Sequence, residues 1–148
     1  GIVQPGCGPI FHVHLCQSEG FEVRQGTMAY QLPGLPVQYL AAEEKIVFEQ
    51  TVPHKFWNAG GTELIMNSWA KPAGNLQRYM TILFLSTSKR HSNTPALFDA
   101  AYLTIQYKGE FDVLEIPHLV KSLIFPAVYW IGRAFGIYKK YEVETSSR

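Results

Sequence analysis

Two histidines stand two residues apart near the start of the chain, in the alternating run Phe11-His12-Val13-His14-Leu15. Such alternation is typical of a β-strand. Side chains of a strand leave its two faces in turn, so both imidazoles leave the same face, roughly 7 Å apart along the chain. That spacing lets the two rings converge on one ion, although such a pair also occurs in ordinary cores and surfaces.

Two further residues extend the pair. Glu19 follows closely enough to return on a neighbouring strand, and His54 lies forty residues after His14. Three neutral imidazole nitrogens and one carboxylate suit first-row transition metals better than calcium or magnesium. Cys16 lies between the first ligand candidates and is a less favoured soft ligand.

The spacing resembles that of a known family. Gly6, five residues, His12-Val13-His14, four residues, Glu19, six residues and Gly26 match the first motif of the cupin superfamily at every position. The apolar stretch after the motifs is similar to the C-terminal helical extension of a subgroup of single-domain cupins.

The match to the second cupin motif is less complete. His54 and Asn58 keep its spacing, and we expect Asn58 to brace the turn with side-chain hydrogen bonds. Glu43 and Thr51 stand where the family has glycine, and Glu49 stands where it has proline. Thr51 cannot adopt a left-handed conformation as cheaply as glycine, so these departures bear on the turn that leads into His54.

The resemblance implies a small β-barrel that binds one divalent metal. Its ligands would be His12, His14, Glu19 and His54, with two or so coordination positions left for water and substrate. Iron, manganese, nickel, cobalt, copper and zinc all remain open as the metal. We also assign Glu19 a catalytic role, because its charge sets the anionic character of the site.

The fold prediction follows from two kinds of periodicity. Residues 1–70 contain short alternating runs punctuated by glycine and proline, which indicate a cupin-type double-stranded β-helix, a small antiparallel barrel or jelly roll. Residues 75–140 form an extension of about three helices, packed on the barrel or on a partner within the same domain unit. The resemblance also predicts barrel strands before Gly1. The polar stretch 86–94, with His91 on the surface, is expected to be a loop.

The segment from Leu119 to Tyr138 is apolar almost throughout. Lys121 and Arg133 lie inside it and Pro126 breaks its middle, which argues against a membrane span. Its apolar residues surround the helix, so more than one face needs cover. We expect packing within the domain or across a homodimer, with a peripheral membrane contact as the second choice.

Three apolar residues share the side of the strands that carries the candidate ligands: Phe21, Val23 and Phe56. We predict that they bind substrate, with core packing as an equal alternative. The barrel half offers few cations, which argues against a phosphorylated substrate. An apolar or aromatic molecule, phenolic or polyketide-like, fits better.

The composition excludes several classes of protein. The 148 residues are 47% hydrophobic with a net charge of only +1, so the chain is not intrinsically disordered. It carries no basic run for phosphates, so we expect no nucleic-acid partner. No charged and then apolar leader opens the sequence, which favours a cytoplasmic location.

We therefore expect a metal-dependent cupin enzyme that acts on a small molecule, with oxygenase chemistry favoured. A non-oxidative isomerase, decarboxylase or cyclase is the first alternative. A module that binds a metal or small ligand without turnover is the second, since a fold alone does not decide function.

Overall fold

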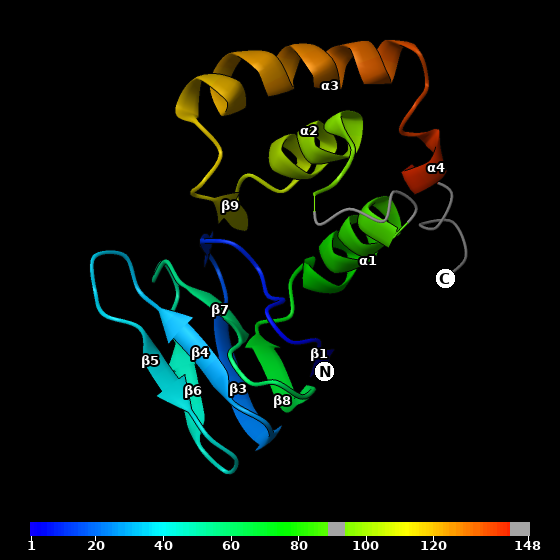
Figure 1. Cartoon of the computed structure of the whole chain (residues 1–148). Coiled ribbons are helices and arrows are strands. Elements are labelled where there is room, and N and C mark those ends of the chain that lie inside the picture. Colours follow the sequence, from blue (N-terminus) through cyan, green and yellow to red (C-terminus); the bar gives the residue numbers. More distant parts are fainter. Residues whose placement is uncertain (89–93, 143–148) are drawn as a thin grey trace. The chain divides into compact units, whose positions relative to one another are not determined.

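The computed structural model describes residues 1–88 and 94–142 (Figure 1). The chain forms two compact units. The first comprises Gly1–Gly74 and Gly109–Glu115, and the second comprises Asn75–Lys108 and Ile116–Arg148. His91 lies outside the described residues.

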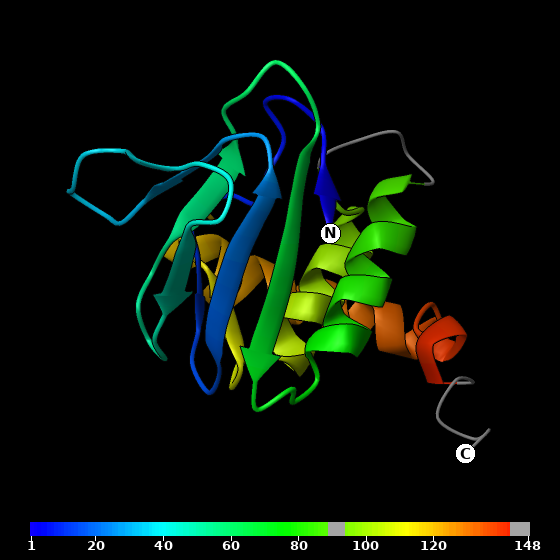
Figure 2. The same ribbon diagram turned by 90° about the horizontal axis from the view of Figure 1, so that it is seen from below.

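The first unit contains nine strands, all paired antiparallel. They are β1 (Ile2–Val3), β2 (His12–His14), β3 (Ser18–Gln25), β4 (Met28–Gln31), β5 (Gln38–Leu40), β6 (Lys45–Phe48), β7 (Lys55–Asn58), β8 (Leu64–Lys71) and β9 (Phe111–Val113). The sheet orders are β1-β8-β3-β6, β5-β4-β7 and β2-β9. Figure 2 shows the long strand β3, in blue, beside β8, in green.

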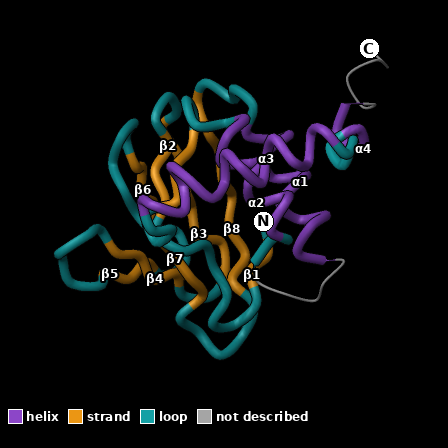
Figure 3. Tube along the Cα trace, turned by 90° about the horizontal axis from the view of Figure 1, so that it is seen from above, coloured by secondary structure: helices purple, strands orange, loops and turns teal. Residues whose placement is uncertain are grey.

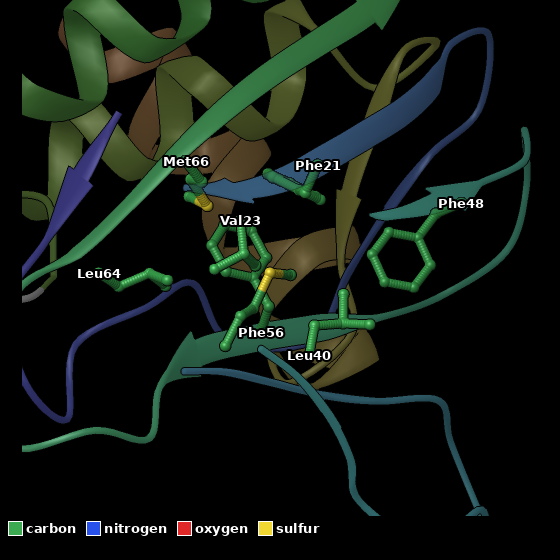
Figure 4. Close-up of a cluster of buried hydrophobic side chains, with 8 residues drawn as sticks. Phe21, Val23, Leu40, Phe48, Phe56, Leu64 and Met66 are labelled. Carbon is green, nitrogen blue, oxygen red and sulfur yellow. The ribbon is translucent and has the colours of Figure 1, made fainter. Parts of the chain in front are cut away.

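One hydrophobic cluster fills the space between the two larger sheets (Figure 4). Its members come from both sheets: Phe21, Val23, Met28, Leu40, Phe48, Phe56, Leu64 and Met66. Phe21 and Val23 are two residues apart on β3, so strand alternation points both inward. The predicted mainly β, cupin-type barrel followed by helices is therefore confirmed.

Gly26, the last residue of the first motif, ends β3 with a backbone that favours glycine. Its φ is +89°, and an added Cβ would lie 2.9 Å from the carbonyl oxygen of Glu63. An L side chain there would meet both conformational strain and backbone contact. The motif glycine thus sets the sharp turn between β3 and β4.

The second unit contains α1 (Leu76–Ser88), α2 (Leu97–Gln106), a π-helical turn η1 (Val120–Ile124), α3 (Phe125–Ala134) and α4 (Lys139–Glu142). Helix α1 runs through Ser88, so residues 86–88, which were predicted to be a loop, are helical. Pro126 lies two residues after η1, and the π-helical turn runs directly into α3, so the chain stays helical through the proline. Strands and helices are coloured separately in Figure 3.

The segment formed by η1 and α3 is covered on one face only. Phe125, Tyr129 and Gly132 are buried against the rest of the second unit. Other apolar side chains remain exposed: Leu119, Leu123, Ile124, Trp130, Ile131 and Phe135. Among the residues described, no helix has both the length and the apolar character that a membrane span requires.

Candidate metal centre

The four predicted ligand residues come from two strands and one isolated β-bridge. His12 and His14 belong to β2, and Glu19 belongs to β3. His54 precedes β7 and forms an antiparallel bridge with His12. Each of these two residues donates its backbone N–H to the carbonyl oxygen of the other at 3.0 Å. Backbone pairing therefore holds two sequence-distant histidines together.

The side chains converge on one oxygen of Glu19. Its Oε2 lies 3.1 Å from Nε2 of His54, 3.4 Å from Nε2 of His14 and 3.9 Å from Nε2 of His12. The candidate ligand atoms all lie within 4.8 Å of one another. One ion at the centre of such a group is close enough to reach all of them.

Backbone carbonyls fix the orientation of two of the rings. Nδ1 of His12 donates to the carbonyl oxygen of Ile10, and Nδ1 of His54 donates to that of Val52, each at 2.9 Å. A neutral imidazole that donates from Nδ1 has a lone pair on Nε2. These lone pairs face the carboxylate of Glu19, which is unfavourable unless a proton or a cation lies between them. The donor set therefore fits a divalent metal, and the carbonyls act as the outer partners that orient ligating histidines.

The carboxyl of Glu19 carries the opposite charge to such a cation. Its burial alone favours the neutral acid. When a proton lies on each Nε2, hydrogen bonds from His12, His14 and His54 outweigh the burial and hold the pKa of Glu19 well below its usual range. Glu19 is therefore an anion at neutral pH, as a ligand of a cation must be.

Two phenylalanines pack against the histidines. The ring of Phe48 stacks on His54 at 3.9 Å between centroids, nearly parallel. Phe111 lies edge-on to His14 at 5.3 Å, and the pairing of β9 with β2 places it there. Phe111 was not predicted to lie at the site, because the sequence pattern beyond residue 75 favours helices. The alternating run Phe111-Asp112-Val113 after Gly109 is the signal that could have shown it.

The site is deeply buried on one side and accessible on the other. His14 and His54 are buried, whereas the side chains of His12 and Glu19 keep 18% and 15% of their surface exposed. Solvent therefore reaches the cluster at His12 and Glu19 and not at the two buried histidines. Cys16 lies outside the cluster, is exposed, and donates its thiol to the carbonyl oxygen of Gly109.

The three residues predicted to bind substrate lie in the hydrophobic cluster of the barrel. Phe21 and Val23 are almost fully buried, and Phe56 is buried with its ring 4.5 Å from that of Phe21. The structure thus shows what they pack against. Their contact with a substrate stays a prediction.

Two residues that replace motif glycines adopt the conformation that glycine favours. Glu43 has φ +70° and Thr51 has φ +64°. The N–H of Glu43 donates to the carbonyl oxygen of Val23 at 2.8 Å. The turn before His54 keeps the shape that the family motif implies, and non-glycine residues carry the strain.

Asn58 braces the far end of β7, as predicted. It is almost fully buried, and its Nδ2 donates to the carbonyl oxygens of Val3 and Thr62 at 2.8 and 2.7 Å. Its Oδ1 accepts the backbone N–H of Gly60 at 2.9 Å. The second motif therefore retains both its histidine and its structural asparagine.

Both motifs thus occupy adjacent antiparallel strands and bring four ligand candidates to one point. The barrel has a cupin-type fold. No family model matches the sequence. A stretch of 80 residues, 53% of this chain, is 30% identical to the oxidoreductase iacF of Pestalotiopsis fici and covers 39% of that protein. The chain therefore spans less than half the length of the curated relative it matches.

Several solved structures are similar to part of the chain. A protein with a double-stranded β-helix domain from Klebsiella pneumoniae is 23% identical, with a TM-score of 0.46 over 49% of this chain and 64% of that one. A cupin-like protein from Thermotoga maritima is 21% identical, with a TM-score of 0.43 over 51% of this chain and 55% of that one.

Proposed function

We propose that the chain is a metal-dependent enzyme that acts on a small apolar or aromatic molecule, phenolic or polyketide-like, by oxygenase chemistry. The observation that carries this proposal is the convergence of His12, His14, Glu19 and His54 with one side left accessible. A structural ion is normally closed off by protein ligands, whereas a catalytic one keeps a position open.

The donor set supports redox chemistry. Three imidazoles and one carboxylate suit iron, manganese, cobalt, nickel, copper or zinc, and the redox-active members of that group support oxygen chemistry. The relative from Pestalotiopsis fici is named an oxidoreductase, which agrees with this choice.

A bound metal of this kind would polarise a phenolate or enolate oxygen, or activate dioxygen. The protein's own residues do the rest. Glu19 supplies a negative charge that offsets the cation, and the backbone carbonyls behind His12 and His54 hold those rings in place. Phe48 and Phe111 keep water away from the buried histidines. Substrate would enter beside His12 and Glu19.

Dioxygen uptake in the presence of phenolic compounds tests the proposal. We expect the purified protein to consume dioxygen with at least one such compound. Glu19→Gln should lower the rate by about tenfold or more, because a ligand charge is lost. Glu22→Gln is the matched control. Glu22 lies three residues after Glu19 on β3, so its side chain leaves the opposite face of the strand, where it pairs with Arg24 and Lys45.

The same assay separates the other functions. If product forms without consumption of dioxygen, the enzyme is a non-oxidative isomerase, decarboxylase or cyclase and not an oxygenase. Binding of a phenolic compound without any product would leave a non-catalytic binding module.

We further propose that the protein forms a homodimer through the exposed face of η1 and α3. Leu123, Trp130 and Phe135 are each more than half exposed there, and a second copy would cover them. Light scattering after gel filtration should show a dimer, and Trp130→Glu should shift it to monomer. Flotation with liposomes by a monomeric protein would point instead to the peripheral membrane contact. The cytoplasmic location stays a prediction.

A further inference from the structure

The helical unit contains a cleft of about 370 Å³ that takes no part in the candidate metal centre. Residues of α1, α2 and α3 and their flanks line it: Asn75, Arg78, Tyr102, Gln106, Tyr107, Tyr129, Arg133 and Tyr138. All of them belong to the second compact unit. The volume falls within the range of clefts that bind small molecules.

Buried tyrosine rings form the floor of the cleft. Tyr102, Tyr107, Tyr129 and Tyr138 are each less than a tenth exposed. The centroids of Tyr102 and Tyr138 lie 4.9 Å apart, and those of Tyr129 and Tyr138 lie 5.4 Å apart. These contacts fix the rings, so the tyrosine lining of the cleft is preformed.

The rim of the cleft is cationic. Arg78 and Arg133 line it together with two amides, and none of its described lining residues is acidic. The neighbouring carboxylate of Asp99 is already engaged by Nζ of Lys140 at 2.8 Å. The rim therefore has a local positive charge that a ligand can complement.

Contacts within the protein hold the two guanidinium groups. Nη1 of Arg133 donates to the Tyr129 hydroxyl at 3.4 Å, and that hydroxyl donates to Oε1 of Gln106 at 3.3 Å. Nη2 of Arg78 donates to the carbonyl oxygen of Tyr141. A guanidinium carries five N–H donors, so such bonds are compatible with further bonds to a ligand.

We propose that this cleft binds a small aromatic anion, a carboxylate or a phosphate monoester. The planar fork of arginine matches both oxyanions. The tyrosine floor would take the ring, and the two arginines would take the charged group. This site is independent of the reaction proposed for the barrel.

Calorimetric titration at low salt tests the proposal with four probes. We expect 4-hydroxybenzoate or phenyl phosphate to bind with one ligand per chain, and the tighter of the two identifies the source of the oxyanion. Inorganic phosphate should bind more weakly than phenyl phosphate, and uncharged p-cresol at least about tenfold more weakly than either aromatic anion. The same titration on His54→Ala should give an unchanged affinity, which separates the cleft from the candidate metal centre.

Variants of the rim provide the decisive comparison. Arg78→Ala and Arg133→Ala should each weaken binding about tenfold or more, since a charged hydrogen bond is lost. Lys108→Ala removes an exposed cation of the same unit outside the cleft and should leave the affinity unchanged.

Gln106→Glu tests the proposal even if the two arginine variants fail to fold. It keeps an oxygen for the Tyr129 hydroxyl and adds a negative charge at the rim, so it should also weaken binding. Equal affinity in Gln106→Glu and the unmodified protein would overturn the proposal. Tight binding of p-cresol, no binding of either aromatic anion, or loss of binding in His54→Ala would overturn it as well.

Discussion

The backbone N–H of Thr51 donates a hydrogen bond of 2.8 Å to the carbonyl oxygen of His14. Thr51 holds this position with φ at +64°, a left-handed conformation that is costly for a β-branched residue. The bond ties the turn before His54 to the strand that carries two other candidate ligands. Local strain at Thr51 thus accompanies the positioning of three histidines.

Thr51→Gly should stabilise the protein. Glycine adopts the same φ without a steric penalty, so we expect the free energy of unfolding to rise by about 1 kcal/mol. The Thr51 side chain is exposed, and little packing is lost. Urea unfolding measures the change, with Thr51→Ala as the control that keeps Cβ and should gain less. A loss of stability in Thr51→Gly would show that the turn does not need a left-handed residue.

Asn58→Ala should destabilise the barrel. Three buried hydrogen bonds of its side chain are lost, and their partners are left unpaired, so we expect a cost of about 3 kcal/mol. The side chain of the exposed Asn67 donates to Glu22 at 3.2 Å. Asn67→Ala is the control and should change stability by less than about 0.5 kcal/mol. Similar losses in the two variants would contradict the bracing role of Asn58.

Phe21→Ala separates packing from substrate binding. The ring is 1% exposed within the hydrophobic cluster, so its loss should cost about 3–5 kcal/mol of stability. Tyr39→Ala on the exposed side of β5 is the control and should cost little. If the folded variant also shows a raised KM for the phenolic substrate, the predicted role in binding holds. An unchanged KM would show that Phe21 packs in the core and does not contribute to substrate binding.

Asp99 should make the helical unit sensitive to acid. Burial alone would raise the pKa of Asp99, but hydrogen bonds from Lys140, Tyr141 and Ser86 outweigh it and lower the pKa below the ordinary value of 3.8. A lowered folded pKa stabilises the fold at every pH above that ordinary value, and the gain disappears as the pH falls through the folded pKa.

Thermal unfolding of Asp99→Asn across the pH range measures this contribution. At pH 7 the variant should melt at a lower temperature than the unmodified protein. The difference should shrink as the pH falls below about 4. A difference that stays constant down to pH 2 would assign the loss to packing instead of charge.

Much of the metal centre could be predicted because its first motif is local. His12, His14 and Glu19 lie on the consecutive strands β2 and β3, and strand alternation decides which way the side chains point. The substitution of Thr51 for a motif glycine raised doubt about the turn before His54. The structure shows that hydrogen bonding keeps the left-handed conformation even with threonine there.

Other features depend on contacts between distant residues and left little trace in the sequence. Strand β9 has three residues and pairs with β2, far away along the chain, so the surrounding helical pattern concealed Phe111. Pro126 indicated a break in the middle of an apolar helix. The π-helical turn before it places the proline in the first turn of α3 instead.

Metal analysis of protein purified without a chelating resin tests the central claim most directly. We expect about one equivalent of a transition metal per chain, and His14→Ala and His54→Ala should each abolish that stoichiometric content. His118→Ala, which removes an exposed histidine outside the cluster, should retain it. Full metal content in both His14→Ala and His54→Ala, or no metal in the unmodified protein even after incubation with each candidate ion, would contradict the account.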